Sequence, residues 1–169
     1  MDKNLWAKVQ CTDTEKAELL KTVFLMVNLG HESNCWGLLH LDKILEKTDN
    51  RFLKIAIKLI VKGYEVECIR TVLENIIHSE SCDNKTLFEK ILISKAVIDI
   101  YYRSSSEVIK TTLLSMLGEK WLATYFDKDS FSYLYNSSLP EERQIIQYML
   151  HNDLQAEKNS LYCAVMEPV

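Results

Sequence analysis

Glycine and proline are scarce in this chain, which has four glycines and two prolines among its 169 residues. The glycines stand far apart, so the sequence has no glycine-rich loop of the kind that cradles a phosphate group. Because glycine and proline also shape most tight turns, little material remains for the loops on which active sites commonly lie. These shortages argue against a phosphate-binding enzyme and favour a chain built almost wholly from regular elements.

Side chains that could hold a metal or act as catalysts are similarly sparse. Of the four histidines, His31 precedes Cys35 by four residues, but no third ligand with metal-site spacing accompanies the pair. The five cysteines are odd in number and contain no close pair, which is typical of proteins in the reducing cytoplasm. We therefore expect a cytoplasmic protein with no enzyme activity, no metal and no cofactor.

Long apolar runs and a positive net charge are absent as well. The longest mostly apolar segment, residues 91–102, contains two charged residues, and each would cost about 2.5–3.5 kcal/mol at the centre of a bilayer. The formal net charge is −4, whereas nucleic-acid-binding surfaces usually carry clustered positive charge. Lys54, Lys58 and Lys62 recur at every fourth residue, and we interpret them as the solvent-facing side of one helix. We expect a soluble protein that neither spans a membrane nor binds nucleic acid.

Apolar residues are plentiful, at 47% of the chain, and recur at the three- and four-residue spacing of amphipathic helices. Residues that cap helices precede several of these segments. Thr12 with Glu15, and Thr86 with Glu89, have the spacing of a capping box. The pattern predicts an all-α bundle of eight or nine helices. They are expected at residues 13–29, 33–45, 50–62, 65–78, 87–102, 104–117, 119–126, 130–135 and 141–158.

The breaks between these helices predict how the chain is organised. Gly30 is placed to end the first helix and Gly63 to end the third, because glycine readily adopts the left-handed conformation at a helix end. The polar stretch of residues 79–84 predicts a boundary between two small helical lobes. We place these lobes at residues 1–80 and 81–169.

Residues 52–77, with the sequence FLKIAIKLIVKGYEVECIRTVLENII, place an apolar helix, a single glycine and an acidic helix in succession. Upstream, residues 36–42 (WGLLHLD) contain a glycine that is followed five residues later by a carboxylate. In both stretches the chain resembles the cytoplasmic helical region of flagellar stator subunits of the MotA type, over about residues 19–77. The matching positions of the longer stretch are Leu59, Ile60, Val61, Gly63, Glu67, Ile69, Arg70, Leu73 and Glu74.

In that family the region contacts the rotor's switch protein through opposite charges on an exposed helix. The resemblance implies that Asp42 matches the family's interacting carboxylate, whereas Asn34 stands where the family has an arginine. Lys43 and Glu46 lie close to Asp42, at the C-terminal end of the same predicted helix. We therefore expect Asp42, Lys43 and Glu46 to bind a protein partner, for which the resemblance implies a flagellar motor component.

A second candidate for partner binding is the aromatic-rich stretch of residues 121–135, where aromatic and polar side chains are interspersed. Trp121, Tyr125 and Phe131 would form a partner-binding patch if they are exposed, and a small packed core if they are not. Together these features predict a helical adaptor that binds a protein partner through charged and aromatic surfaces. Two alternatives stay open: a homo-oligomeric structural protein, and a small-ligand carrier or enzyme with a pocket between the lobes.

Overall fold

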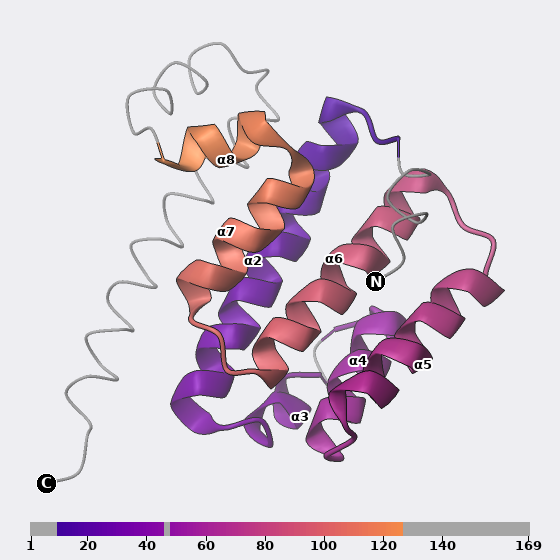
Figure 1. The fold of residues 1–169 in the computed structure, drawn as a ribbon, viewed down its shortest axis with the longest axis vertical. Coiled ribbons are helices and arrows are strands. Elements are labelled where there is room, and N and C mark those ends of the chain that lie inside the picture. The colour runs from indigo at the N-terminus through magenta and orange to yellow at the C-terminus, as the bar shows by residue number, and fades with distance from the viewer. Residues whose placement is uncertain (1–9, 46–47, 127–169) are drawn as a thin grey trace, which may run out of the picture. The chain divides into compact units, whose positions relative to one another are not determined.

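The computed structural model describes residues 10–45 and 48–126, and every regular element in these residues is an α-helix (Figure 1). The helices are α2 (Asp13–Trp36), α3 (His40–Leu45), α4 (Arg51–Val61), α5 (Val66–Ser79), α6 (Asn84–Tyr101), α7 (Ser106–Leu117) and α8 (Glu119–Phe126). The predicted all-α fold class is confirmed for these residues. The helices expected at residues 130–135 and 141–158 lie outside the described residues, so the predicted count of eight or nine stays a prediction.

The chain divides into two compact units, Met1–Met116 and Leu117–Val169. Helix α6 lies at the centre of the first unit, where it packs against α2 on one side and against α4 and α5 on the other (Figure 1). Eleven of its eighteen residues are buried, because apolar side chains occupy most of its circumference. The boundary predicted at residues 80 and 81 therefore falls inside the first unit, at the connection that leads into its central helix.

Helix α2 is longer than the sequence predicts, because Gly30 does not end it. The helix is 24 residues long, ends at Trp36 and is followed by Gly37, whose positive φ of +83° is a backbone conformation that glycine adopts far more readily than other residues. A Cβ atom at position 30 would collide with Cδ1 of Ile109, a buried residue of α7. Gly30 thus serves close packing between α2 and α7, and the predicted turn at this residue is wrong.

The starts of two helices show which capping predictions were right. Thr12 and Glu15 form the predicted capping box, in which the Thr12 N–H donates to Glu15 Oε2 at 2.7 Å. Helix α6 is capped instead by Asp83, whose Oδ1 accepts from the Thr86 N–H at 2.9 Å. The box predicted for Thr86 and Glu89 is wrong because Glu89 accepts a hydrogen bond from Thr22 of α2, at 2.8 Å.

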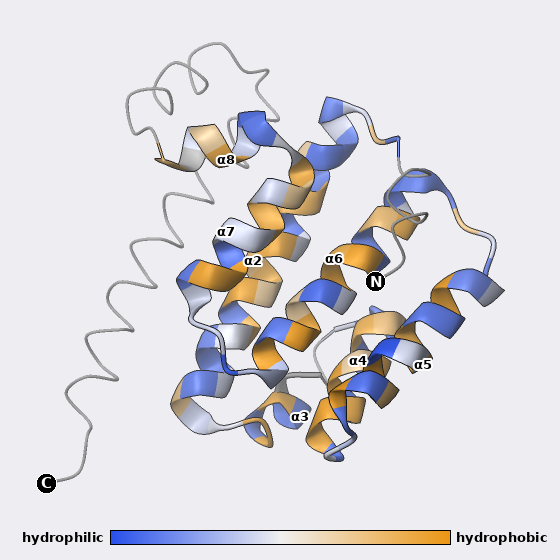
Figure 2. Cartoon of the chain, in the orientation of Figure 1, coloured by the Kyte–Doolittle hydropathy of each residue, from blue (hydrophilic) through white to orange (hydrophobic). Residues whose placement is uncertain are grey.

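Helices α4 and α5 form a hairpin through Gly63, whose φ is +75°, as the sequence predicts. Both helices are amphipathic, and Figure 2 shows hydrophobic and hydrophilic residues interspersed along them. Helix α5 buries a single narrow row of side chains, Ile69, Leu73 and Ile77, at a spacing of four residues. It is therefore an outer helix that covers α6 with one face only.

Candidate protein-binding surface

The connection between α2 and α3 is a tight turn centred on Gly37. The Gly37 N–H donates to the Ser33 carbonyl at 3.0 Å, and the His40 N–H donates to the Gly37 carbonyl at 3.1 Å. Helix α3 begins at His40, so only three residues separate the two helices. This turn fixes the directions in which the neighbouring side chains leave the backbone.

Two large apolar side chains on this turn are exposed to solvent. Trp36 is 63% exposed and Leu39 is 74% exposed, the highest values among large apolar side chains in the described part of the first unit. The sequence predicts both residues within a single helix that starts near residue 33. That prediction is wrong, because α2 continues to Trp36 and its last buried residue is Ser33.

Charged residues of α3 follow this apolar pair in the sequence. Leu41 is fully buried, while the neighbouring Asp42 and Lys43 are exposed. Glu46, the third charge predicted to contact a partner, lies outside the described residues. We name Trp36, Leu39, Asp42 and Lys43 together the turn surface.

Polar contacts at the end of α2 support the turn surface from one side. His40 Nε2 lies 3.3 Å from Glu32 Oε2, and the imidazole and indole ring centroids of His40 and Trp36 are 6.2 Å apart. His31 Nε2 is 3.6 Å from the Cys35 sulfur, as the four-residue spacing suggests. Among the described residues, no three metal-binding side chains come together.

Asn34, at the position where the resembled family has an arginine, has a structural contact here. Its Nδ2 donates to the carbonyl of Ser104 at 3.0 Å, which ties the end of α2 to the connection between α6 and α7. The amide is therefore engaged within the first unit. Asp42, by contrast, makes no side-chain hydrogen bond or ion pair with any residue that the structure describes.

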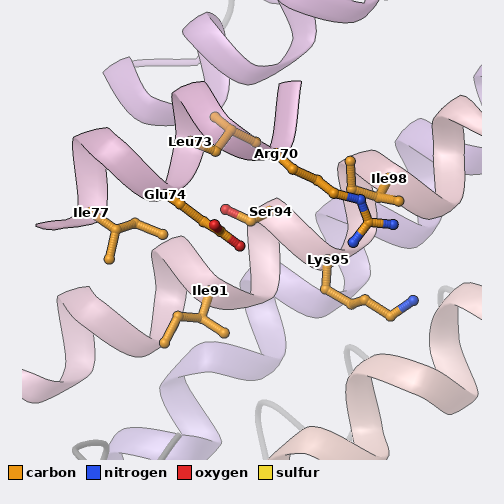
Figure 3. A pocket seen from close by; sticks show the side chains of 8 residues that line it. All are labelled: Arg70, Leu73, Glu74, Ile77, Ile91, Ser94, Lys95 and Ile98. Carbon is orange, nitrogen blue, oxygen red and sulfur yellow. The ribbon is translucent and has the colours of Figure 1, made fainter. Parts of the chain in front are cut away.

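A groove between α5 and α6 is the second surface feature of the first unit (Figure 3). It is lined by Arg70, Leu73, Glu74, Ile77, Ile91, Ser94, Lys95 and Ile98. Its volume is about 50 Å³, well below the roughly 300–1,000 Å³ of typical ligand pockets. The groove has room for a side chain of a partner but is too small to enclose a cofactor.

The predicted aromatic patch is described only in part, within the second unit. Trp121 is half-buried, and Lys120 Nζ lies 5.4 Å from the centroid of a Trp121 ring, a cation–π distance. Phe126, at the end of α8, is exposed. The side chain of Tyr125 and the whole of Phe131 lie outside the described residues.

Comparisons with known proteins give no relative for this chain. No family model matches it, and neither a curated protein nor a solved structure matches it. None of the helices in the described ranges combines the length and the apolar character that crossing a bilayer requires.

Proposed function

We propose that this protein is a helical adaptor that binds a protein partner through the turn surface. The observation that carries the proposal is the exposure of Trp36 and Leu39, within a few residues of the exposed charges Asp42 and Lys43 in the sequence. Tryptophan is among the residues most enriched at the energetic centres of protein interfaces, and an apolar centre with a charged rim is their common arrangement.

The apolar pair would supply most of the binding free energy. Burying a leucine side chain contributes about 1.5–3 kcal/mol, and a tryptophan buries still more area. Exposed ion pairs contribute only about 0.2–1 kcal/mol each, so Asp42 and Lys43 would mainly set orientation and association rate. This division of roles predicts that truncating the apolar pair weakens binding more than changing either charge.

The candidate partner is a flagellar motor component, and the support for it is the resemblance of residues 19–77 to MotA-type stator subunits. Asp42 corresponds to the family's interacting carboxylate, and its side chain is exposed to solvent. Because Asn34 replaces the family's arginine and contacts Ser104 instead, the charge pairing would be one-sided. A basic side chain of the partner is the expected contact of Asp42.

The experiment that tests the proposal compares two double variants as bait in affinity purification from native lysate. One is Trp36→Ala with Leu39→Ala. The matched control is Tyr102→Ala with Val108→Ala, which removes an aromatic and an aliphatic side chain that are 58% and 51% exposed elsewhere on the first unit. We expect the first variant to recover at least about tenfold less partner than wild type. A tenfold loss of affinity corresponds to about 1.4 kcal/mol of binding free energy, which is less than the burial of the two apolar side chains would supply.

The control should retain the wild-type amount, and both variants should unfold at the wild-type temperature. Equal recovery with both variants would contradict the proposal. Recovery of small molecules without any protein partner would also contradict it, and would favour a ligand carrier instead.

A further inference from the structure

Helix α4 and Lys62, the residue that follows it, carry a continuous row of positive charge on one face. Arg51, Lys54, Lys58 and Lys62 follow one another at spacings of three, four and four residues. At about 100° per residue these four positions fall within an arc of about 80°, and at about 1.5 Å per residue they extend over about 16 Å. Helix α4 contains no acidic residue that would interrupt the row.

These four cations differ from three lysines of helix α6 in the same unit. Lys85, Lys90 and Lys95 each pair with a carboxylate, namely Glu18, Glu80 and Asp99. By contrast, no described residue forms an ion pair with any member of the α4 row, and three of its members are exposed while Lys54 is half-buried. The row is therefore a local cluster of positive charge on a chain whose formal net charge is −4.

Exposed apolar side chains accompany the row. Ile55 is exposed at the edge of the same face, and Tyr64 is exposed just beyond the end of α4. The opposite face of the helix is buried in the core through five residues. They are Phe52, Leu53, Ala56, Ile57 and Ile60. The row is thus presented by a helix whose position is fixed by packing.

We infer that the row Arg51, Lys54, Lys58 and Lys62, together with Ile55, docks an acidic amphipathic helix of a protein partner. Carboxylates spaced three and four residues apart on such a helix form a ridge with the same repeat as the α4 row. An apolar residue beside that ridge would cover Ile55, as the apolar residues of a helix do when it packs onto another protein. This surface is distinct from the turn surface, so either one can fail in experiments without the other.

A bilayer and a nucleic acid fit the same surface less well. An amphipathic helix binds a bilayer by burying its apolar face in the lipid, but the apolar face of α4 is already buried in the protein core. A nucleic acid would meet one narrow row on an acidic protein, and its phosphates offer no contact for Ile55 or Tyr64. An acidic amphipathic helix offers carboxylates to the cations and apolar side chains to Ile55 and Tyr64.

The test uses the full chain and a synthetic helical peptide of about 18 residues, a length at which helix formation becomes favourable in water. The peptide carries glutamates at i, i+4 positions along one side and leucines beside them, and a second peptide carries glutamine in place of glutamate. Binding is measured by fluorescence anisotropy for wild type, for Lys58→Glu with Lys62→Glu, and for the matched control Lys16→Glu with Lys21→Glu. The control changes net charge equally, on α2 rather than α4.

We expect the acidic peptide to bind wild type and the control with similar affinity. The α4 variant should bind at least about tenfold more weakly, because two favourable charge pairs become repulsive. The glutamine peptide should bind all three proteins weakly. Raising the salt concentration should reduce binding to wild type and control, as expected for exposed charges.

Three outcomes would overturn the inference. One is failure of the acidic peptide to bind wild type, and another is equal weakening by the α4 and control variants. The third is tighter binding of wild type to phosphatidylserine vesicles or to duplex DNA than to the acidic peptide, with the same loss in the α4 variant. That last result would assign the row to phosphate-bearing ligands.

Discussion

Gly30 lies in the middle of α2, and the side chain of Ile109 from α7 occupies the space above it. Ile109 is fully buried, and Ile100 of α6 lies on the same side of Gly30. A side chain at position 30 would therefore have to displace packed atoms. The close approach of α2 and α7 depends on the absence of a single Cβ atom.

The first prediction follows from this contact. Gly30→Ala should lower the free energy of unfolding by about 1–3 kcal/mol, because Ile109 must leave its rotamer in a packed core. Adding Ile109→Val removes Cδ1, the colliding atom, so the double variant should recover part of the loss. Urea denaturation of the two single variants and the double variant measures this coupling. A Gly30→Ala variant as stable as wild type would show that the helices do not pack this closely.

Asp83 acts through hydrogen bonds that require its ionised form. The Thr86 N–H and hydroxyl both donate to its carboxylate, at 2.9 and 2.7 Å, and the backbone bond is the main cause that lowers the pKa of Asp83. A lowered folded-state pKa means that this stabilisation is present above the unfolded-state pKa. It is lost as the pH falls through the lowered folded-state value.

The second prediction concerns this pH dependence. Asp83→Ala should be less stable than wild type at about pH 7, and the difference should shrink as the solution is acidified to about pH 2. Asp83→Asn is the matched control, since asparagine caps helices about as well as aspartate at any pH. Urea midpoints at several pH values provide the measurement. A constant difference between wild type and Asp83→Ala would contradict an ionised cap.

The third prediction concerns Asp42, whose side chain is exposed. Asp42→Lys should change stability by less than about 1 kcal/mol, mainly through the lost interaction of an acidic residue with the start of α3. The same change should weaken binding to the partner recovered in affinity purification by up to about tenfold. A melting temperature far below that of wild type would show that Asp42 is structural instead.

At the scale of elements, α5 and α6 differ sharply in how they are held. Helix α5 buries Ile69, Leu73 and Ile77 and has no side-chain cap at Glu65, whereas α6 is buried over most of its length. Few buried contacts and many exposed backbone hydrogen bonds favour local opening. The outer helix should therefore open more often than the central one.

The fourth prediction is that amide hydrogens of α5 exchange faster than those of α6 under native conditions. Hydrogen exchange followed by mass spectrometry resolves the two helices. Ile69→Asp should unfold the whole first unit rather than α5 alone, because a charge would be buried without a partner in a fully enclosed position. Equal protection of α5 and α6 would show that α5 is held by more than its three buried residues.

Much of the helical arrangement follows from local pattern, but the ends of helices depend on tertiary contacts. The hairpin at Gly63 and the cap at Thr12 are predictable, since both rest on neighbouring residues. The predicted helix end at Gly30 is wrong because the role of this residue depends on Ile109, which is 79 residues away in sequence. The exposure of Trp36 and Leu39 does not follow from local pattern either, since it depends on where α2 ends.

At the scale of the molecule, the first unit is a packed helical body with α6 at its centre and its distinctive features on its surface. The turn surface and the α4 row are on different helices, and the described groove is too small for a cofactor. The sequence predicts the all-α class because apolar spacing is a local property. It could not predict which apolar residues stay exposed, because that depends on how the helices pack together.

The fifth prediction concerns self-association. If the turn surface binds a different protein and not a second copy of this chain, the chain alone should show the monomer mass of 19.7 kDa at every concentration tested. Light scattering coupled to size exclusion gives this mass directly. A mass that rises with concentration in wild type, but not in the variant with Trp36→Ala and Leu39→Ala, would instead support a homo-oligomer.

The most direct test of the turn surface is photo-crosslinking in the cells that make the protein. A benzophenone amino acid replaces Leu39 in one variant and Val108 in a control, both being exposed positions. We expect light to produce one discrete adduct with a different protein at position 39 and none at position 108. No adduct at position 39, or the same adduct at both positions, would contradict partner binding through the turn surface.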